Sequence, residues 1–327
     1  LMLALVGCNG GEKADNSDTG SESQVVEDKF PTEPIRYVLA NAPGGSIETL
    51  IRKFQPYLEE ALGQPIMIEC IEGAGGIIGT NVVKEAEPDC YTIMTRSASS
   101  LINSFLRSGA DFTLDDFDYL SRFSNDPAVI MVRNDSPYQT INDLIEDAKA
   151  NPGKVRVSVS GINDINYLAL RVLEEQAGID LNLVTYDGGS KSRLAVINGE
   201  VAATQCNYFG ASSMWDDCRI LAVCHTENNL EALEGIPTLN DALGLDVPPA
   251  PASYMVFMPD GVKEQYPERF EKLLNAFETA WSNPEFLEAM KEMGQDGYIE
   301  VLSPEETVAE IDMMYEFLAS TLDMAEG

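Results

Sequence analysis

The chain of 327 residues carries 21 Lys and Arg against 54 Asp and Glu, a formal net charge of -33, with one His and six Cys. This length corresponds to about two domains, and 44% hydrophobic residues suffice for packed cores, which excludes a wholly disordered chain. The charge argues against binding nucleic acid, whose phosphates require clustered Lys and Arg. A pocket of backbone N–H groups with one or two cations can still hold a small anion.

Residues 1–8 form a short apolar run that ends in Gly7 and Cys8. We interpret this run as the end of an export signal, and residues 5–8 resemble the bacterial lipobox, whose cysteine is lipidated. An ordinary buried segment with a free Cys is the alternative. Residues 9–29 hold six acids, two Lys and no aromatic residue, which is typical of a flexible tether. We therefore expect a protein outside the cytoplasm, anchored to the cell membrane by lipid on Cys8.

From residue 30 onwards, short apolar runs alternate with longer amphipathic ones, as in βαβ units with parallel strands. The first series predicts strands at 35–39, 66–71 and 91–95, and helices at 47–61 and 77–85. The second series predicts strands at 155–159 and 181–186, and helices at 141–150, 166–177 and 191–198. A late strand at 254–258 precedes helices at 263–281, 284–293 and 304–322.

These series predict an α/β protein with two lobes, each a sheet flanked by helices. Because only helices follow the late strand, we expect the chain to return to the first lobe. The predicted first lobe comprises residues 30–130 and 255–327, and the second comprises residues 131–254. Ligands of open α/β sheets lie beyond the carboxyl ends of the strands, and ligands of two-lobed proteins lie between the lobes.

A glycine-rich loop, residues 43–46, follows the first strand and opens the first helix. The N–H groups of a first helical turn and the positive end of the helix dipole favour a bound anion. A tight turn with Ser46 as the N-cap is an equally good interpretation. Loops 159–164 and 186–190 occupy equivalent places in the second series, and simple helix capping by Ser160, Asn163 or Asp164 is the alternative there.

The glycines between Gly73 and Gly79 are spaced almost like a dinucleotide-binding fingerprint. Against that interpretation, a complete βα unit precedes them, and no acid ends the next strand. An exported dinucleotide-binding oxidoreductase remains the alternative function. A single His without a G-x-S-x-G motif argues against a Ser-His-Asp hydrolase. We expect no enzyme activity and no cofactor.

Cysteine spacing argues against a zinc site, because no C-x-x-C motif is present. Besides Cys8 the chain has five cysteines, so at least one thiol is unpaired. A disulfide among Cys206, Cys218 and Cys224 is one interpretation, and buried free thiols are the one we favour.

Several motifs run in the same order as in a known family, from residue 30 to about residue 322. They include Pro43-Gly44-Gly45-Ser46, Gly73-Ala74-Gly75-Gly76, Tyr186-Asp187-Gly188-Gly189, Asn198-Gly199-Glu200-Val201 and Ile236-Pro237-Thr238. Together they resemble the tripartite tricarboxylate transporter receptor family, the Bug solute-binding proteins. The resemblance implies a two-lobed type II periplasmic-binding fold that closes over a small organic acid or amino acid. It also implies a large and a small membrane subunit that receive the solute. A receptor that signals to a sensor kinase is the alternative, and we expect a monomer.

The resemblance further implies that one loop from each lobe, 41–46 and 160–166, holds the solute carboxylate. Glu48 corresponds to a position near the ligand. Arg96 and Lys191 are candidate counter-charges for the solute carboxylate, and the alternative for both is an ordinary location on the solvated surface. The extra acid Asp164 argues against polyanions such as citrate. The candidate ligand-binding residues are Asn41, Pro43, Gly44, Gly45, Ser46, Glu48, Arg96, Ser97, Ser160, Gly161, Asn163, Asn166, Tyr186 and Gly188.

Overall fold

The computed structural model describes residues 29–322 apart from 42, 125, 162, 163, 187 and 229, and the side chains of residues 46, 212 and 213 are also left out. The expected lipidation residue, Cys8, and nearly all of the tether lie outside this range. Contacts divide the chain into Leu1–Phe30 and Pro31–Gly327, and every strand belongs to the second unit. The boundaries of the two predicted lobes stay a prediction.

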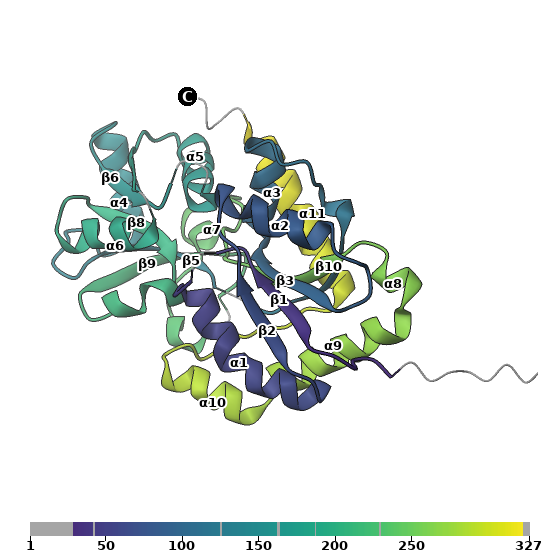
Figure 1. The fold of residues 1–327 in the computed structure, drawn as a ribbon. Coiled ribbons are helices and arrows are strands. Elements are labelled where there is room, and N and C mark those ends of the chain that lie inside the picture. Colours follow the sequence, from purple (N-terminus) through teal and green to yellow (C-terminus); the bar gives the residue numbers. More distant parts are fainter. Residues whose placement is uncertain are drawn as a thin grey trace, which may run out of the picture. The chain divides into compact units, whose positions relative to one another are not determined.

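The first sheet has five strands in the order β2-β1-β3-β10-β4. Their bounds are β1 Ile35–Leu39, β2 Ile66–Cys70, β3 Thr92–Ser97, β4 Phe117–Arg122 and β10 Tyr254–Pro259. Strand β1 runs parallel to β2 and β3, whereas β10 is antiparallel to both β3 and β4. The predicted late strand is therefore β10, and it pairs in the sheet that begins the fold (Figure 1).

The second sheet also has five strands, in the order β7-β6-β8-β5-β9. Their bounds are β5 Ala128–Arg133, β6 Arg156–Val159, β7 Asn182–Thr185, β8 Ala203–Asn207 and β9 Cys218–Cys224. Strand β6 is parallel to β7 and β8, and β5 is antiparallel to β8 and β9. In each sheet, the predicted solute loops therefore lie at the carboxyl ends of parallel strands. These strands are β1 and β3 in the first sheet and β6 and β7 in the second.

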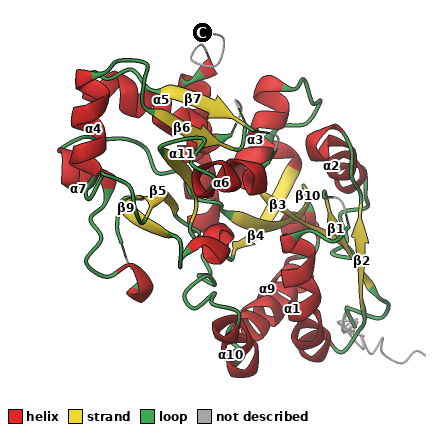
Figure 2. Ribbon diagram, turned by 90° about the vertical axis from the view of Figure 1, so that its left-hand side faces the viewer, coloured by secondary structure: helices red, strands yellow, loops and turns green. Residues whose placement is uncertain are grey.

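Helices cover both faces of the first sheet (Figures 1 and 2). One face carries α1 Ser46–Leu62, α9 Pro267–Trp281 and α10 Pro284–Glu292, and the other carries α2 Ile77–Lys84, α3 Ala98–Arg107 and α11 Pro304–Ser320. The second sheet packs with α4 Ile141–Ala150, α5 Ile165–Ala177, α6 Gly189–Ile197 and α7 Leu239–Leu243. A short helix, α8 Val262–Gln265, precedes α9.

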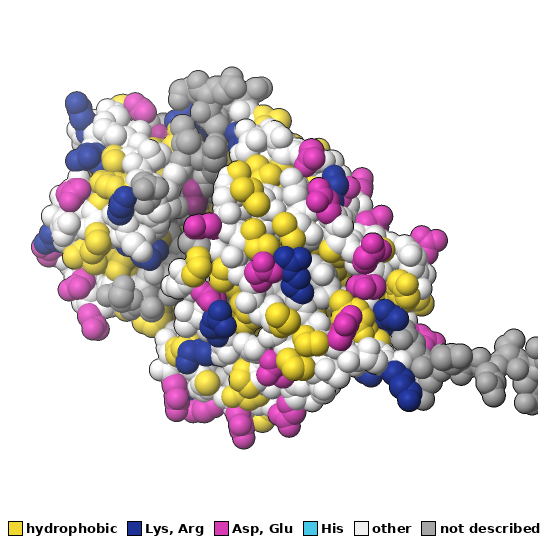
Figure 3. All heavy atoms as spheres, in the orientation of Figure 1, with side chains coloured by type: hydrophobic (Ala, Val, Ile, Leu, Met, Phe, Trp, Pro, Cys, Tyr) yellow, Lys and Arg dark blue, Asp and Glu magenta, His cyan; other side chains and the backbone are white. Residues whose placement is uncertain are grey.

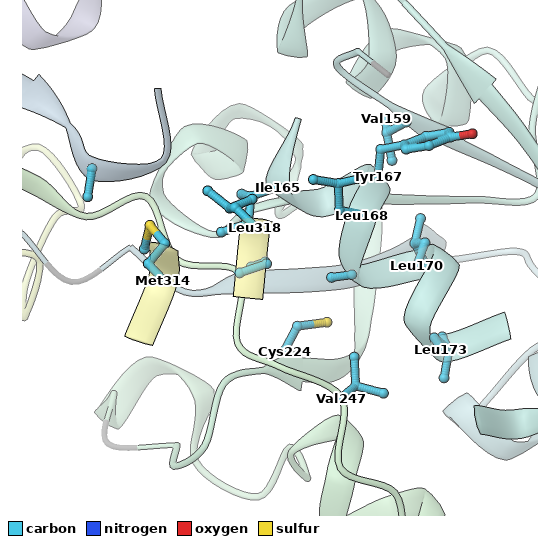
Figure 4. Close-up of a cluster of buried hydrophobic side chains, with 14 of the residues drawn as sticks. Val159, Ile165, Tyr167, Leu168, Leu170, Leu173, Cys224, Val247, Met314 and Leu318 are labelled. Atoms are coloured by element: carbon cyan, nitrogen blue, oxygen red, sulfur yellow. The ribbon is translucent and has the colours of Figure 1, made fainter. Parts of the chain in front are cut away.

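The last helix shares its packing with the second sheet. Leu318 and Met314 of α11 belong to one buried hydrophobic cluster together with Ile165 and Leu168 of α5 (Figure 4). Leu318 and Leu168 are both fully buried. Hydrophobic burial therefore joins a helix of the first sheet to a helix of the second.

Two expectations about the elements need correction. The sheets are mixed rather than parallel, because β5 and β10, which the chain reaches from the other sheet, pair antiparallel with both of their neighbours. The single helix predicted at 263–281 is divided into α8 and α9. Pro267 is the first residue of α9 and has no N–H to continue α8, and Tyr266 before it is non-helical at φ -134°.

Candidate functional site

The loop before α1 turns on Gly44, whose φ is +85°, and the N-cap of α1 is Gly45 rather than Ser46. Among the side chains that the structure describes, none caps this helix. Asn41, Pro43 and Gly44 are exposed. The loop therefore presents backbone groups at the carboxyl end of β1, as an anion site requires.

Glu48 is turned back onto its own loop. Its carboxylate accepts the Gly44 N–H at 2.6 Å and a bond from Arg52 Nε at 2.6 Å, and the residue is 8% exposed. The Gly44 N–H, followed by Arg52, holds the pKa of Glu48 below its ordinary value. One amide of the loop is therefore already satisfied by an internal carboxylate.

Arg96, at the end of β3, is buried with 3% exposure, so the solvated-surface interpretation is wrong. Its guanidinium donates to Gly75 O at 2.7 Å, Ser100 O at 3.0 Å, Ser104 Oγ at 2.6 Å and Thr80 Oγ1 at 2.8 Å. Burial lowers its pKa to about 10. All four partners are uncharged, and Arg96 remains protonated at neutral pH.

The glycines near Arg96 have local structural explanations. At Gly76, with φ +95°, a Cβ would lie 3.0 Å from Arg96 Cζ and Nη2. At Gly79, a Cβ would lie 2.9 Å from the Ile71 carbonyl oxygen, where α2 approaches the β1 side of the sheet. The fingerprint-like spacing is therefore accounted for by space for a guanidinium and by close helix packing. Ser97, beside Arg96, is the N-cap of α3 and accepts the Ser100 N–H at 3.3 Å.

In the second sheet, the loop after β6 is organised by Asp164, the N-cap of α5. Asp164 accepts the Asn166 N–H at 2.8 Å and the Ser160 hydroxyl at 2.5 Å. Capping by Asp164 is thus confirmed, whereas Asn163 lies outside the described residues. Gly161 is half-buried, and Asn166 is 3% exposed.

The loop after β7 is bonded to the loop after β6, because the Gly188 N–H donates to Ser160 O at 3.2 Å. Gly188, at φ +97°, is the N-cap of α6, and none of the described side chains caps that helix. The Tyr186 hydroxyl bonds Glu200 at 3.3 Å. Lys191 is exposed on the first turn of α6. The structure therefore brings Ser160 and Gly188 together and turns the Tyr186 hydroxyl to an acid of its own lobe.

Three residues in this region were not predicted as site residues. Asn166 Nδ2 lies 3.5 Å from Asn207 Oδ1, and Asn207 Nδ2 donates to the Asp126 carbonyl oxygen at 2.9 Å. The Asp126 carboxylate accepts the Phe209 N–H at 2.9 Å, and Arg193 of α6 interacts with it electrostatically. Only Arg193 had a sequence signal, since it follows the Gly188-Gly189 loop by one helical turn.

Acidic side chains are spread over the face drawn in Figure 3, in keeping with the composition. Among the described residues, no group of three or more His, Cys, Asp and Glu is arranged to hold a metal ion. No helix among them is both long and apolar enough to cross a membrane. The five described cysteines are free thiols, and burial raises the pKa of Cys206 and Cys224 to about 12.

Comparison with known proteins places the chain in a family. Residues 50–305 match the tripartite tricarboxylate transporter family receptor. A Pseudomonas sp. (strain P51) relative, a UPF0065 protein in the tcbD-tcbE intergenic region, is 28% identical over 82% of this chain and 79% of its own length.

Solved structures share the fold. A TctC solute binding protein from Polaromonas superposes with a TM-score of 0.78 at 22% identity, covering 90% of this chain and 99% of its own. An R. palustris protein with adipate superposes with a TM-score of 0.70 at 20% identity, covering 90% of this chain and 98% of its own. MatC from Rhodopseudomonas palustris with bound malate superposes with a TM-score of 0.69 at 19% identity, covering 90% of this chain and 100% of its own. The chain belongs to the tripartite tricarboxylate transporter receptor family, the TctC or Bug proteins, and is a solute-binding receptor rather than an enzyme.

Proposed function

We propose that this receptor works outside the cytoplasm, held at the membrane by lipid on Cys8, and binds a small carboxylate at the loops 41–46, 160–166 and 186–189. It then delivers the solute to a large and a small membrane subunit. The adipate and malate in the two related structures support a small dicarboxylate as the solute class.

The observation that carries this proposal is the state of two helix N-termini. Helices α1 and α6 both follow a parallel strand, both begin after a glycine, and neither has a cap from any described side chain. Helices α3, α4, α5, α7, α10 and α11 all have one. Helices α2, α8 and α9 also lack one, but the turn before α2 is packed against the Arg96 guanidinium, and α8 and α9 follow no parallel strand. Uncapped N–H groups and the positive ends of two helix dipoles favour the carboxylates of one solute.

A matched pair of variants tests the α6 terminus. Ser190→Glu puts a carboxylate on the second residue of α6, and Asn142→Glu puts one on the second residue of α4, in the same sheet. Both side chains are exposed, so both variants should fold. We expect S190E to weaken the binding of malate and adipate at least about tenfold, or 1.4 kcal/mol, and N142E to leave it within about twofold. Equal effects would contradict an anion site at α6.

Calorimetric titration of residues 30–327 with mono-, di- and tricarboxylates, amino acids and neutral sugars tests the solute class. Binding of neutral sugars alone would refute the carboxylate assignment. Cys8→Ser in the full precursor should move the protein from the membrane fraction to the soluble fraction. Uptake of labelled solute by vesicles with the two membrane subunits separates transport from signalling to a sensor kinase.

A further inference from the structure

Asp126 is a buried acid at the point where the chain passes between the two sheets. It lies between β4 and β5, and the residue is 6% exposed. Its carbonyl oxygen accepts the Ala252 N–H at 2.9 Å, from the segment that returns to β10. Its carboxylate accepts N–H bonds from Phe209 and Gly210, directly after β8. The backbone of Asp126 is thus bonded to the segment that returns to β10, and its carboxylate is held by the segment after β8.

Arg193 lies one turn into α6, with its guanidinium between two glycines. A Cβ at Gly189 would lie 2.9 Å from Arg193 Nη1, and one at Gly210 would lie 3.6 Å away. Arg193 Nη2 donates to Ser190 Oγ at 3.5 Å, at the uncapped start of α6. The guanidinium therefore adds positive charge where that helix terminus already favours an anion.

The groups that face Asp126 come from several elements. Arg193 of α6 favours the ionised carboxylate, while Cys206 of β8, Tyr254 of β10 and Tyr298 after α10 are also within electrostatic range. Burial raises the pKa of each of these three, so all are neutral at pH 7. Burial also raises the pKa of Asp126 to about 7, against the N–H bonds and Arg193. Asp126 is thus the member of this group that titrates near neutrality.

We propose that Arg193 and Asp126 act as a pair that determines which solute charge is accepted: Arg193 pairs with a solute carboxylate, and Asp126 takes up one proton as it does so. This inference rests on the proposed function. A solute carboxylate beside Arg193 carries the same charge as ionised Asp126 and repels it. It also pairs with Arg193, whose positive charge had favoured the ionised form of Asp126. Protonated, Asp126 no longer repels the solute. Binding of an acid is then linked to proton uptake.

The sign of the linkage follows. Below pH 7 Asp126 is already protonated, so affinity should be constant. Above pH 7 binding must bring a proton with it, so affinity should fall by up to about tenfold per pH unit. Malate and adipate are fully ionised above about pH 6.5 and add no protonation of their own. A neutral diamide analogue should bind weakly and without this pH dependence.

The experiment is calorimetric titration of residues 30–327 with malate and with adipate from about pH 6.5 to 8.5, in buffers of different ionisation enthalpy. We expect uptake approaching one proton at pH 8. Asp126→Asn should make the affinity independent of pH, Arg193→Gln should weaken binding at least about tenfold and remove the pH dependence, and the exposed control Asp260→Asn should behave as wild type.

The outcomes separate the two proposals. If the wild-type protein binds a carboxylate with pH-independent affinity and no proton uptake, the pair is refuted and the receptor function stands. If no acid binds the wild-type protein at any pH, the proposed solute class fails and the pair fails with it. The proton count of the wild-type protein needs no variant, so misfolding of D126N would not obscure the result.

Discussion

Gly76→Ala tests whether the glycine loop exists to accommodate Arg96. Two separate effects act at this position. The φ of +95° is unfavourable for any L-residue, and the new Cβ would lie 3.0 Å from Arg96 Cζ and Nη2 and 3.1 Å from Nε. The guanidinium cannot easily move aside, because four hydrogen bonds fix it in a site where the residue is 3% exposed.

The adjacent Gly75 provides the control. Its φ is +64°, and a Cβ there would meet no atom within 4 Å. Gly75→Ala should therefore cost only the left-handed backbone, about 1–2 kcal/mol. In Gly76→Ala a backbone cost at least as large, since φ is +95°, is joined by the loss of at least one buried hydrogen bond of Arg96, about 1–3 kcal/mol. The expected loss of unfolding free energy is thus about 2–5 kcal/mol for G76A.

Urea unfolding, followed by circular dichroism, measures the unfolding free energy of both variants. The comparison requires that the dependence of this free energy on urea concentration be the same in both. A double-mutant cycle isolates the contact: G76A should cost less in an Arg96→Met background than in the wild-type protein, because the clashing group is gone while the backbone cost remains. If G76A and G75A are equally destabilising in the wild-type background, the loop has another purpose and the reasoning is wrong.

Three further predictions concern acid stability, the last helix and the thiols. Because the Gly44 N–H and Arg52 lower the pKa of Glu48, its contribution to stability is present above its unfolded pKa, about 4.3, and is lost as pH falls through the lower folded value. Glu48→Gln should therefore reduce the melting temperature at pH 7 and flatten its decline between about pH 5 and 3, whereas exposed Glu60→Gln should do neither. Leu318→Ala, at 0% exposure, should cost about 2–5 kcal/mol of unfolding free energy. Met313→Ala, at 68% exposure on the same helix, should stay within about 0.5 kcal/mol, and similar costs would contradict the shared cluster. In residues 30–327, half-buried Cys70 should react first with a disulfide reagent, and Cys206 and Cys224, with pKa raised to about 12, only after unfolding. Rapid labelling of either buried thiol, measured by mass spectrometry with Cys70→Ser as reference, would refute their burial.

Local patterns predicted much of the fold. The strand at 35–39 and the helix at 141–150 have the predicted bounds, because apolar periodicity and clear end signals coincide there. The strands at 117–122 and 128–133 were not predicted. They follow each other closely in the sequence but belong to different sheets, and no local sequence pattern indicates in which sheet a strand pairs.

The candidate site was predictable only where loops carry it. The loops at Gly44, Ser160 and Gly188 could be predicted because glycines and capping residues follow a strand there. Asp126 and Asn207 have no such signal. Asp126 lies two residues before β5 and Asn207 is the last residue of β8, so their proximity depends on the antiparallel pairing of Ala128 with Asn207 in the second sheet. Glu48 shows the converse limit: its place near the ligand stays a prediction, and in the structure its partners are Gly44, Arg52 and Cys70.

A chain with a net charge of -33 can bind an anion because charge acts over different ranges at different depths. Exposed acids are screened within about 8 Å at physiological salt, so a distributed surface charge has little effect in a buried site. Arg96 is buried, and its four hydrogen-bond partners are neutral oxygens, so salt screens its charge little and none of those partners carries a compensating charge. Arg193 stands at the uncapped start of α6, where the helix dipole adds to it. In the proposed site, the composition is therefore a poorer guide to the sign of the solute than these two cations and two helix termini.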